Sequence, residues 1–162
     1  MAHLFNSGLF FGQSAWHGLG VTLPADSPVR YSIDDAIAIS GLDWTVETRP
    51  VCVDGKEIAG HKAIVRNVLG VVGERYRPLQ NREQFGWFRP FLESGECQFE
   101  TCGALKGGAL VWVLAKVNRA DAEITADDRI RKYLLLTSSH DGSRSTSVGF
   151  CPIRVVCWNT LS

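Results

Sequence analysis

The residues best suited to chemistry in this sequence are arginines and a tyrosine that lie close together. The passage Gly73-Glu74-Arg75-Tyr76-Arg77-Pro78-Leu79-Gln80-Asn81-Arg82 places an aromatic ring between two guanidinium groups. In an extended segment Arg75 and Arg77 point to one face and Tyr76 points to the other. Arg82 opens a predicted helix, whose free N–H groups and positive dipole end also suit an anion. The passage therefore predicts a phosphate-binding surface.

A second basic pair lies on the strand predicted just before this passage. Lys62 and Arg66 share one face there with Ile64. If this strand pairs with the segment that holds Arg75 and Arg77, four positive charges form one stripe. Backbone contacts of this kind, with an aromatic platform, are how single nucleic-acid strands are held without sequence preference. Tyr76 serves as that platform only if a bulge turns the chain.

Three further residues complete the predicted interface. Arg144 lies on a polar hairpin arm, and Arg154 and Trp158 alternate with core-like residues near the end of the sequence. The predicted nucleic-acid-binding residues are Lys62, Arg66, Arg75, Tyr76, Arg77, Arg82, Arg144, Arg154 and Trp158. The alternative is a solvated sheet face, with arginines paired to neighbouring carboxylates and Trp158 covering a sheet edge.

Other reactive side chains do not form a recognisable catalytic or metal site. Ser139, His140 and Asp141 are consecutive on a tight turn, whereas a catalytic triad gathers its members from distant segments. His17 has neither a carboxylate nor another histidine at metal-ligand spacing, and the sequence contains no P-loop. We therefore expect no catalytic residues, metal or cofactor, and a binding protein rather than an enzyme.

Composition limits the class of protein. The 162 residues carry a formal net charge of zero, so the bulk charge does not draw the chain to DNA or acidic membranes. Five cysteines, an odd number, sit in apolar sequence and favour reduced, buried thiols. Without a signal peptide or an apolar run of roughly 18 residues, we expect a cytoplasmic protein that does not cross a membrane.

Two helices are predicted from their capping signals. Ser32 begins the first, with Asp35 three positions later, and Gly41 ends it. Asn81 begins the second as N-cap, and Pro90 kinks this helix or ends it early.

Most of the remaining sequence alternates as strands do. Predicted strands cover 44–53, 61–66, 68–76, 98–104, 109–117, 133–138, 143–150 and 153–158, with hairpin turns at Asp54-Gly55, Lys106–Gly108 and Asp141-Gly142. We expect residues 1–30 to be extended or irregular and 118–129 to form a surface loop. The result is a single α+β domain over residues 1–162, a mainly antiparallel sheet of about six to eight strands with two helices packed on one face.

Several passages together resemble a phage- and plasmid-borne family known as domain of unknown function number 932. They are Met1–Phe5, Ala15–Gly20, Gly41–Trp44, Gly73–Asn81, Leu135–Gly142 and Arg154–Leu161. The resemblance implies a longer protein with a helical C-terminal portion that this chain lacks. It also implies a role in the DNA metabolism of mobile elements, or interference with host defence.

Two functions remain open on these observations. The first is a non-enzymatic protein that binds single-stranded DNA in phage or plasmid recombination, annealing or replication. The second is a protein-interaction module that blocks a host defence complex, which suits the zero net charge better. Self-assembly into a homo-oligomer is expected under either function.

Overall fold

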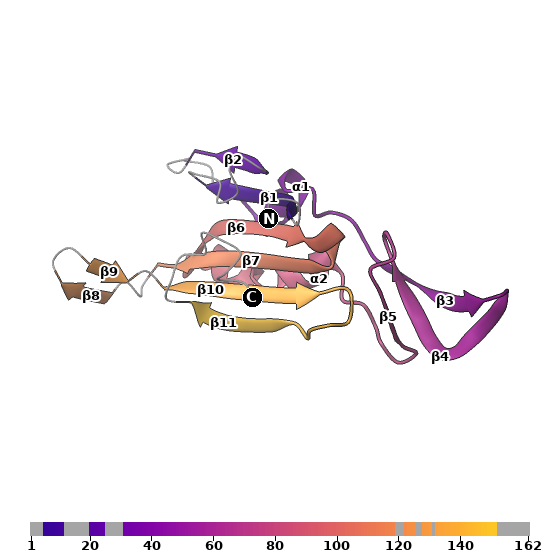
Figure 1. Cartoon of the computed structure of the whole chain (residues 1–162). Coiled ribbons are helices and arrows are strands. Elements are labelled where there is room, and N and C mark those ends of the chain that lie inside the picture. The colour runs from indigo at the N-terminus through magenta and orange to yellow at the C-terminus, as the bar shows by residue number, and fades with distance from the viewer. Residues whose placement is uncertain are drawn as a thin grey trace.

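The computed structural model describes residues 5–11, 20–24, 31–118, 122–125, 128–130 and 132–151. Its larger sheet has six strands in the order β11-β10-β7-β6-β1-β2 (Figure 1). These strands are β1 (Phe5–Phe11), β2 (Val21–Leu23), β6 (Cys97–Leu105), β7 (Leu110–Val117), β10 (Tyr133–Ser139) and β11 (Ser147–Cys151). The pairs are antiparallel except for β1 and β2, which run parallel, so the sheet is mixed.

In the part of the chain that the structure describes, three α-helices complete the body of the molecule. Ser32 caps α1 (Ile33–Ile39) by accepting a hydrogen bond from the Asp35 backbone N–H at 3.1 Å, as predicted. The second predicted helix is broken into α2 (Asn81–Gly86) and α3 (Arg89–Glu93), with Pro90 in the first turn of α3. The N-cap of α2 is Gln80 rather than the predicted Asn81, because Asn81 is buried and bonds other segments.

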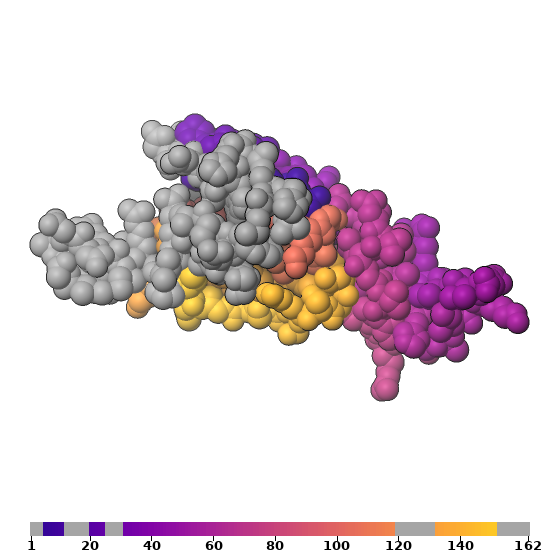
Figure 2. Space-filling view, viewed as in Figure 1, coloured from indigo at the N-terminus to yellow at the C-terminus, as the bar shows by residue number. Residues whose placement is uncertain are grey.

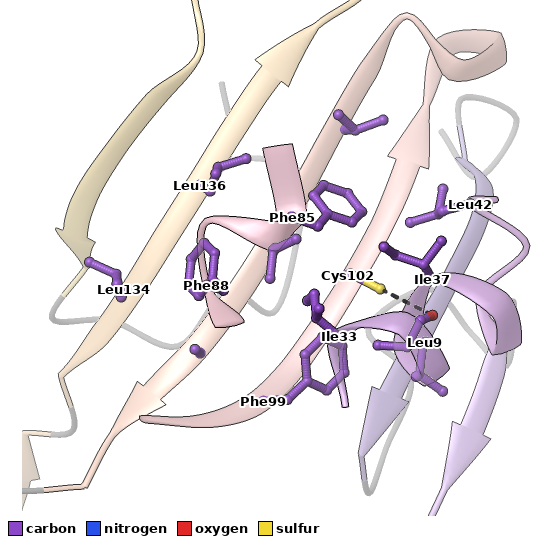
Figure 3. Packing of buried hydrophobic residues seen from close by; sticks show 14 of the residues in the cluster. Leu9, Ile33, Ile37, Leu42, Phe85, Phe88, Phe99, Cys102, Leu134 and Leu136 are labelled. Atoms are coloured by element: carbon purple, nitrogen blue, oxygen red, sulfur yellow. Dashed lines mark hydrogen bonds between the residues drawn. The ribbon is translucent and has the colours of Figure 1, made fainter. Parts of the chain in front are cut away.

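The helices cover one face of the six-stranded sheet, as Figure 3 shows. Ile33 and Ile37 of α1 pack with Phe85 and Phe88 against apolar side chains of the sheet. The Cys102 thiol lies 3.9 Å from the carbonyl oxygen of Ala36, and its complete burial raises the pKa to about 12. The expectation of buried thiols is wrong for Cys52, which is exposed.

The other face of the sheet carries a second apolar cluster around Trp112 and Tyr133, both almost completely buried. Residues 110–115 of β7 are buried without interruption, because this strand is central and covered on both faces. The predicted α+β class is confirmed.

The remaining long strands do not join this sheet, contrary to the expectation of one sheet. β3 (Glu47–Val53), β4 (Lys56–Val65) and β5 (Gly70–Gly73) form a separate antiparallel sheet in the order β3-β4-β5. We call residues 47–73 the arm. It projects beyond one end of the six-stranded sheet and is also visible in the space-filling view (Figures 1 and 2).

β1 lies in the region that was expected to be extended or irregular, where no strand was assigned from the sequence. The expected surface loop 118–129 differs from the structure, because β8 (Ala122–Thr125) pairs with β9 (Asp128–Ile130). The turn Asp54-Gly55 joins β3 to β4 as predicted, with φ values of 50° and 74° that suit a tight hairpin. The predicted strand 153–158 lies outside the described residues.

Candidate nucleic-acid interface

The arm is exposed over most of its length. Every residue from Cys52 to His61 is exposed, so this part of the β3–β4 hairpin has no core of its own. Between Glu47 and Arg77 the sequence holds six basic and four acidic residues, although the whole chain is neutral. The segment therefore carries a local excess of positive charge.

An open hollow of about 780 Å³, the arm groove, lies where β5 meets the turn after β10. Its lining residues are Gly60, Val71, Val72, Gly73, Glu74, Arg75, Tyr76 and Gly142. A neighbouring hollow of about 210 Å³ is lined by Thr48, Arg49, Pro50, Glu57, Gly60, His61, Lys62 and Glu74. The two hollows share Gly60 and Glu74, so they adjoin.

A turn brings Arg75 and Tyr76 to the same groove. The Tyr76 backbone N–H donates to the Gly73 carbonyl at 3.0 Å, which reverses the chain just after β5. The Glu74 N–H donates to the Gly60 carbonyl at 2.9 Å and holds the start of this turn against β4. The extended alternation expected through Arg77 is therefore wrong, because β5 ends at Gly73.

The environment of Tyr76 keeps its phenol neutral. Tyr76 is half-buried, and burial is the main cause that raises its pKa. The nearby Asp141 carboxylate raises it further. A neutral phenol at physiological pH presents an uncharged aromatic ring to the groove, as a stacking platform requires.

Lys62 lies in the middle of the arm, beside the groove. Its register partners are Pro50 on β3 and Val72 on β5, so these three side chains share one face of the arm. Val72 also lines the arm groove. Lys62 therefore lines the hollow that adjoins the groove of Arg75 and Tyr76.

Arg66 does not belong to this surface. It follows the end of β4 and its guanidinium carbon lies 4.2 Å from the centre of the Trp44 ring. Its Nη1 donates to the Gly107 carbonyl at 3.4 Å, on the hairpin between β6 and β7. Arg66 thus bridges the arm and the body, and the predicted stripe of four charges does not form.

The other predicted residues are dispersed. Arg82 lies 3.6 Å from the Asp34 carboxylate, to which Arg89 also binds at 2.8 Å, so Arg82 belongs to the helix layer. Arg77 is exposed beyond the groove, and Arg144 is exposed in the connection between β10 and β11. Arg154 and Trp158 lie outside the described residues.

A buried junction that sequence reasoning missed anchors the groove wall. His140 is 1% exposed, and its Nε2 lies 2.8 Å from Asn81 Oδ1. The Asn81 amide nitrogen donates to the Leu42 carbonyl at 2.9 Å, and the Trp44 ring packs edge-on against His140 with centroids 5.2 Å apart. Three passages that carried the family resemblance meet here. They are Gly41–Trp44, Gly73–Asn81 and Leu135–Gly142. The only signal in the sequence that could have linked them is that all three belong to the passages of the family resemblance.

The geometry of this turn excludes the serine hydrolase arrangement. The Ser138 hydroxyl is bonded to Thr146 Oγ1 at 2.8 Å, and the Ser139 hydroxyl donates to the Arg144 carbonyl at 2.9 Å. His140 is bonded to Asn81 instead of to either serine. Within the described ranges, no group of three or more His, Cys, Asp or Glu residues is arranged to hold a metal ion.

Comparison with known proteins gives one match. A family model with the description "Domain of unknown function (DUF932)" matches residues 68–162, more than half of the chain. Neither the search of curated proteins nor the search of solved structures returns a match. Among the residues that the structure describes, no helix is long and apolar enough to cross a membrane.

Proposed function

Since this chain belongs to the family described as a domain of unknown function, DUF932, we propose its function from the geometry of the arm. The protein binds single-stranded DNA in the arm groove and does not catalyse a reaction on it. It acts in the cytoplasm, in recombination, annealing or replication of a phage or plasmid. The mobile-element setting rests on the sequence resemblance alone.

The observation that carries the proposal is the pairing of a cation and an aromatic ring in one open groove. Arg75 and Tyr76 line it together, and Lys62 lies in the hollow that adjoins it. Guanidinium and ammonium groups bind phosphates, while a tyrosine ring stacks on an unpaired base. Stacking of this kind requires a base that is free of a partner strand, so the arrangement favours a single strand over a duplex.

The size and openness of the groove agree with a short stretch of nucleic acid. Its volume of about 780 Å³ lies within the range of small-ligand sites. The groove is open to solvent rather than enclosed. A single strand of DNA could therefore enter it at one end and leave at the other.

The experiment is fluorescence anisotropy of a labelled oligothymidylate titrated with the protein at two salt concentrations. We expect affinity to fall as salt rises, because bound cations release counterions from the DNA. Lys62→Ala with Arg75→Ala removes two phosphate contacts, which lowers the affinity and reduces the salt slope by about 1.4. Tyr76→Ala weakens binding with little change in that slope.

The matched control is Arg82→Ala with Arg89→Ala. It removes the same charge from the helix layer, where both arginines bind Asp34. We expect this control to keep the wild-type salt slope. Equal losses in the two double variants would show that overall charge, and not the groove, determines binding.

One observation favours the second candidate, a protein-interaction module. Val53, Ile58 and Val71 on the arm are 56%, 39% and 55% exposed, so each of the three strands presents a large apolar side chain to solvent. These side chains would contact a host protein or a second copy of this chain. If the oligonucleotide does not bind at low salt, and Ile58→Asp with Val71→Asp changes the mass measured by light scattering, this function is the better one.

A further inference from the structure

Glu74 is an acidic residue inside the surface proposed to bind a polyanion. It lines both the arm groove, together with Arg75, and the adjoining hollow, together with Lys62. Among the described residues, the ion pairs are those of Arg49, Arg82 and Arg89, and none of them includes Glu74. A carboxylate at this position repels phosphate, so its place in the groove calls for a ligand group that donates hydrogen bonds.

The backbone holds Glu74 at a defined position. Its N–H donates to the Gly60 carbonyl at 2.9 Å. The Tyr76 N–H donates to the Gly73 carbonyl, and this bond fixes Tyr76 two positions after Glu74. Glu74 and the Tyr76 ring therefore belong to one short, hydrogen-bonded turn. Both residues line the arm groove, so a planar group stacked on Tyr76 would lie in the same groove as Glu74.

Glycine leaves space for such a planar group. Gly60 and Gly73 both line the groove, and a Cβ placed on either residue would meet no atom within 4 Å. The space above these two residues is thus open down to the backbone. Glycine at such positions lets a ligand approach the main chain closely.

Among unpaired bases, guanine offers the donors that fit a carboxylate best. Its Watson–Crick edge carries N1–H and the N2 amino group side by side, whereas an ionised carboxylate has two acceptor oxygens. Thymine presents one imino donor between two carbonyl oxygens, which the carboxylate repels. The chemistry of Glu74 therefore discriminates between these bases.

We propose that the arm groove selects an unpaired guanine, with Glu74 accepting hydrogen bonds from its N1–H and N2 amino group while Tyr76 stacks on the ring. This inference rests on the proposed function and adds base selectivity to it. Arg75 and Lys62 bind the flanking phosphates of the same strand.

The test compares three oligonucleotides that differ at one position in an oligothymidylate background: guanine, hypoxanthine or thymine. Hypoxanthine lacks only the N2 amino group. We expect the guanine oligonucleotide to bind about tenfold more tightly than the thymine one, with hypoxanthine between them. Glu74→Gln should reduce the guanine preference to about twofold and strengthen binding of plain oligothymidylate, because it removes a repulsive charge.

Glu57→Gln is the matched control, since Glu57 lines only the adjoining hollow and loses the same charge. It should retain the guanine preference. If Glu74→Gln strengthens guanine and thymine binding by the same factor, Glu74 is only a repulsive charge and the inference is wrong, although the proposed function stands. If none of the oligonucleotides binds at low salt, the proposed function itself fails, and the inference fails with it.

Discussion

The buried imidazole of His140 makes the stability of this protein depend on pH in a predictable way. The Asn81 amide nitrogen donates to Leu42, so the Asn81 oxygen faces His140 and accepts from its Nε2–H. In the neutral ring Nδ1 is then an acceptor, and it is buried without a hydrogen-bond partner in the described part of the chain. Protonation would create a buried cation at Nδ1 with no acceptor to receive its hydrogen.

The magnitude follows from the pKa. Burial is the main cause that lowers the pKa of His140 from 6.5 to about 4; Arg66 lowers it further and Asp141 opposes the shift. Below pH 6.5 the unfolded chain takes up a proton at this residue, whereas the folded protein does so only near pH 4. Stability therefore falls as the pH decreases through this window, by about 3 kcal/mol in total at 1.36 kcal/mol per pH unit.

The assay is urea unfolding of the wild type and of His140→Gln at several pH values between 7.5 and 4. Glutamine keeps a donor for the Asn81 oxygen but has no group that titrates in this window. We expect the variant to be less stable than the wild type at pH 7.5. The difference in the free energy of unfolding should shrink by about 3 kcal/mol toward pH 4.

His61→Gln is the matched control, because it removes an imidazole from an exposed site on the arm. A constant difference between wild type and His140→Gln across the pH range would refute the reasoning. That result would mean that the folded protein accepts the proton as readily as the unfolded chain, and the assignment of Nδ1 as an unprotonated buried acceptor would be wrong.

Two further substitutions test the buried junction around Asn81 and the contact of β5 with the turn after β10. Asn81→Ala leaves the Leu42 carbonyl and the His140 Nε2–H unpaired, and should lower the free energy of unfolding by about 2–4 kcal/mol in urea titrations, whereas Asn67→Ala at an exposed turn should cost little. Gly70→Ala places a Cβ 2.6 Å from the Asp141 carbonyl oxygen, so we expect a loss of about 1–3 kcal/mol and faster proteolysis within the arm. Gly149→Ala, whose Cβ would meet no atom within 4 Å, is its control. Unchanged proteolysis in Gly70→Ala would mean that the close approach of β5 to the 141–142 turn does not hold the arm in place.

Local signals in the sequence were sufficient to predict the start of α1 and the β3–β4 hairpin. Ser32 and Asp35 determine the start of α1 through bonds that span three residues, and Asp54-Gly55 determines a turn through backbone preference alone. Such features depend on neighbours in the chain, so a linear pattern contains them.

The separation of the arm strands from the six-stranded sheet was not predictable in the same way. Periodicity indicates that β4 and β10 are strands, but it does not say which strand pairs with which. β1 was missed because Leu9 and Phe10 are both buried, on opposite faces, so the alternation typical of a half-exposed strand is absent.

The candidate site was predictable in part. The residues Arg75 and Tyr76 were found from composition and spacing, but the turn that brings them to one groove depends on a bond to Gly73. Arg66 and Arg82 were assigned to the predicted nucleic-acid-binding surface because each is a cation close in sequence to the other basic residues of that surface. Their partners, Trp44 and Asp34, come from segments that no local pattern connects to them.

The position of β1 in the six-stranded sheet has a consequence during synthesis. β1 pairs with β6, and the Thr101 hydroxyl donates to the Leu9 carbonyl across 92 positions of sequence. At a translation rate of about 5–20 residues per second, β1 emerges from the ribosome roughly 5–20 s before its antiparallel partner. During that interval the apolar stretch Leu9–Phe11 lacks its antiparallel partner, and its open strand edge is available for pairing with other chains.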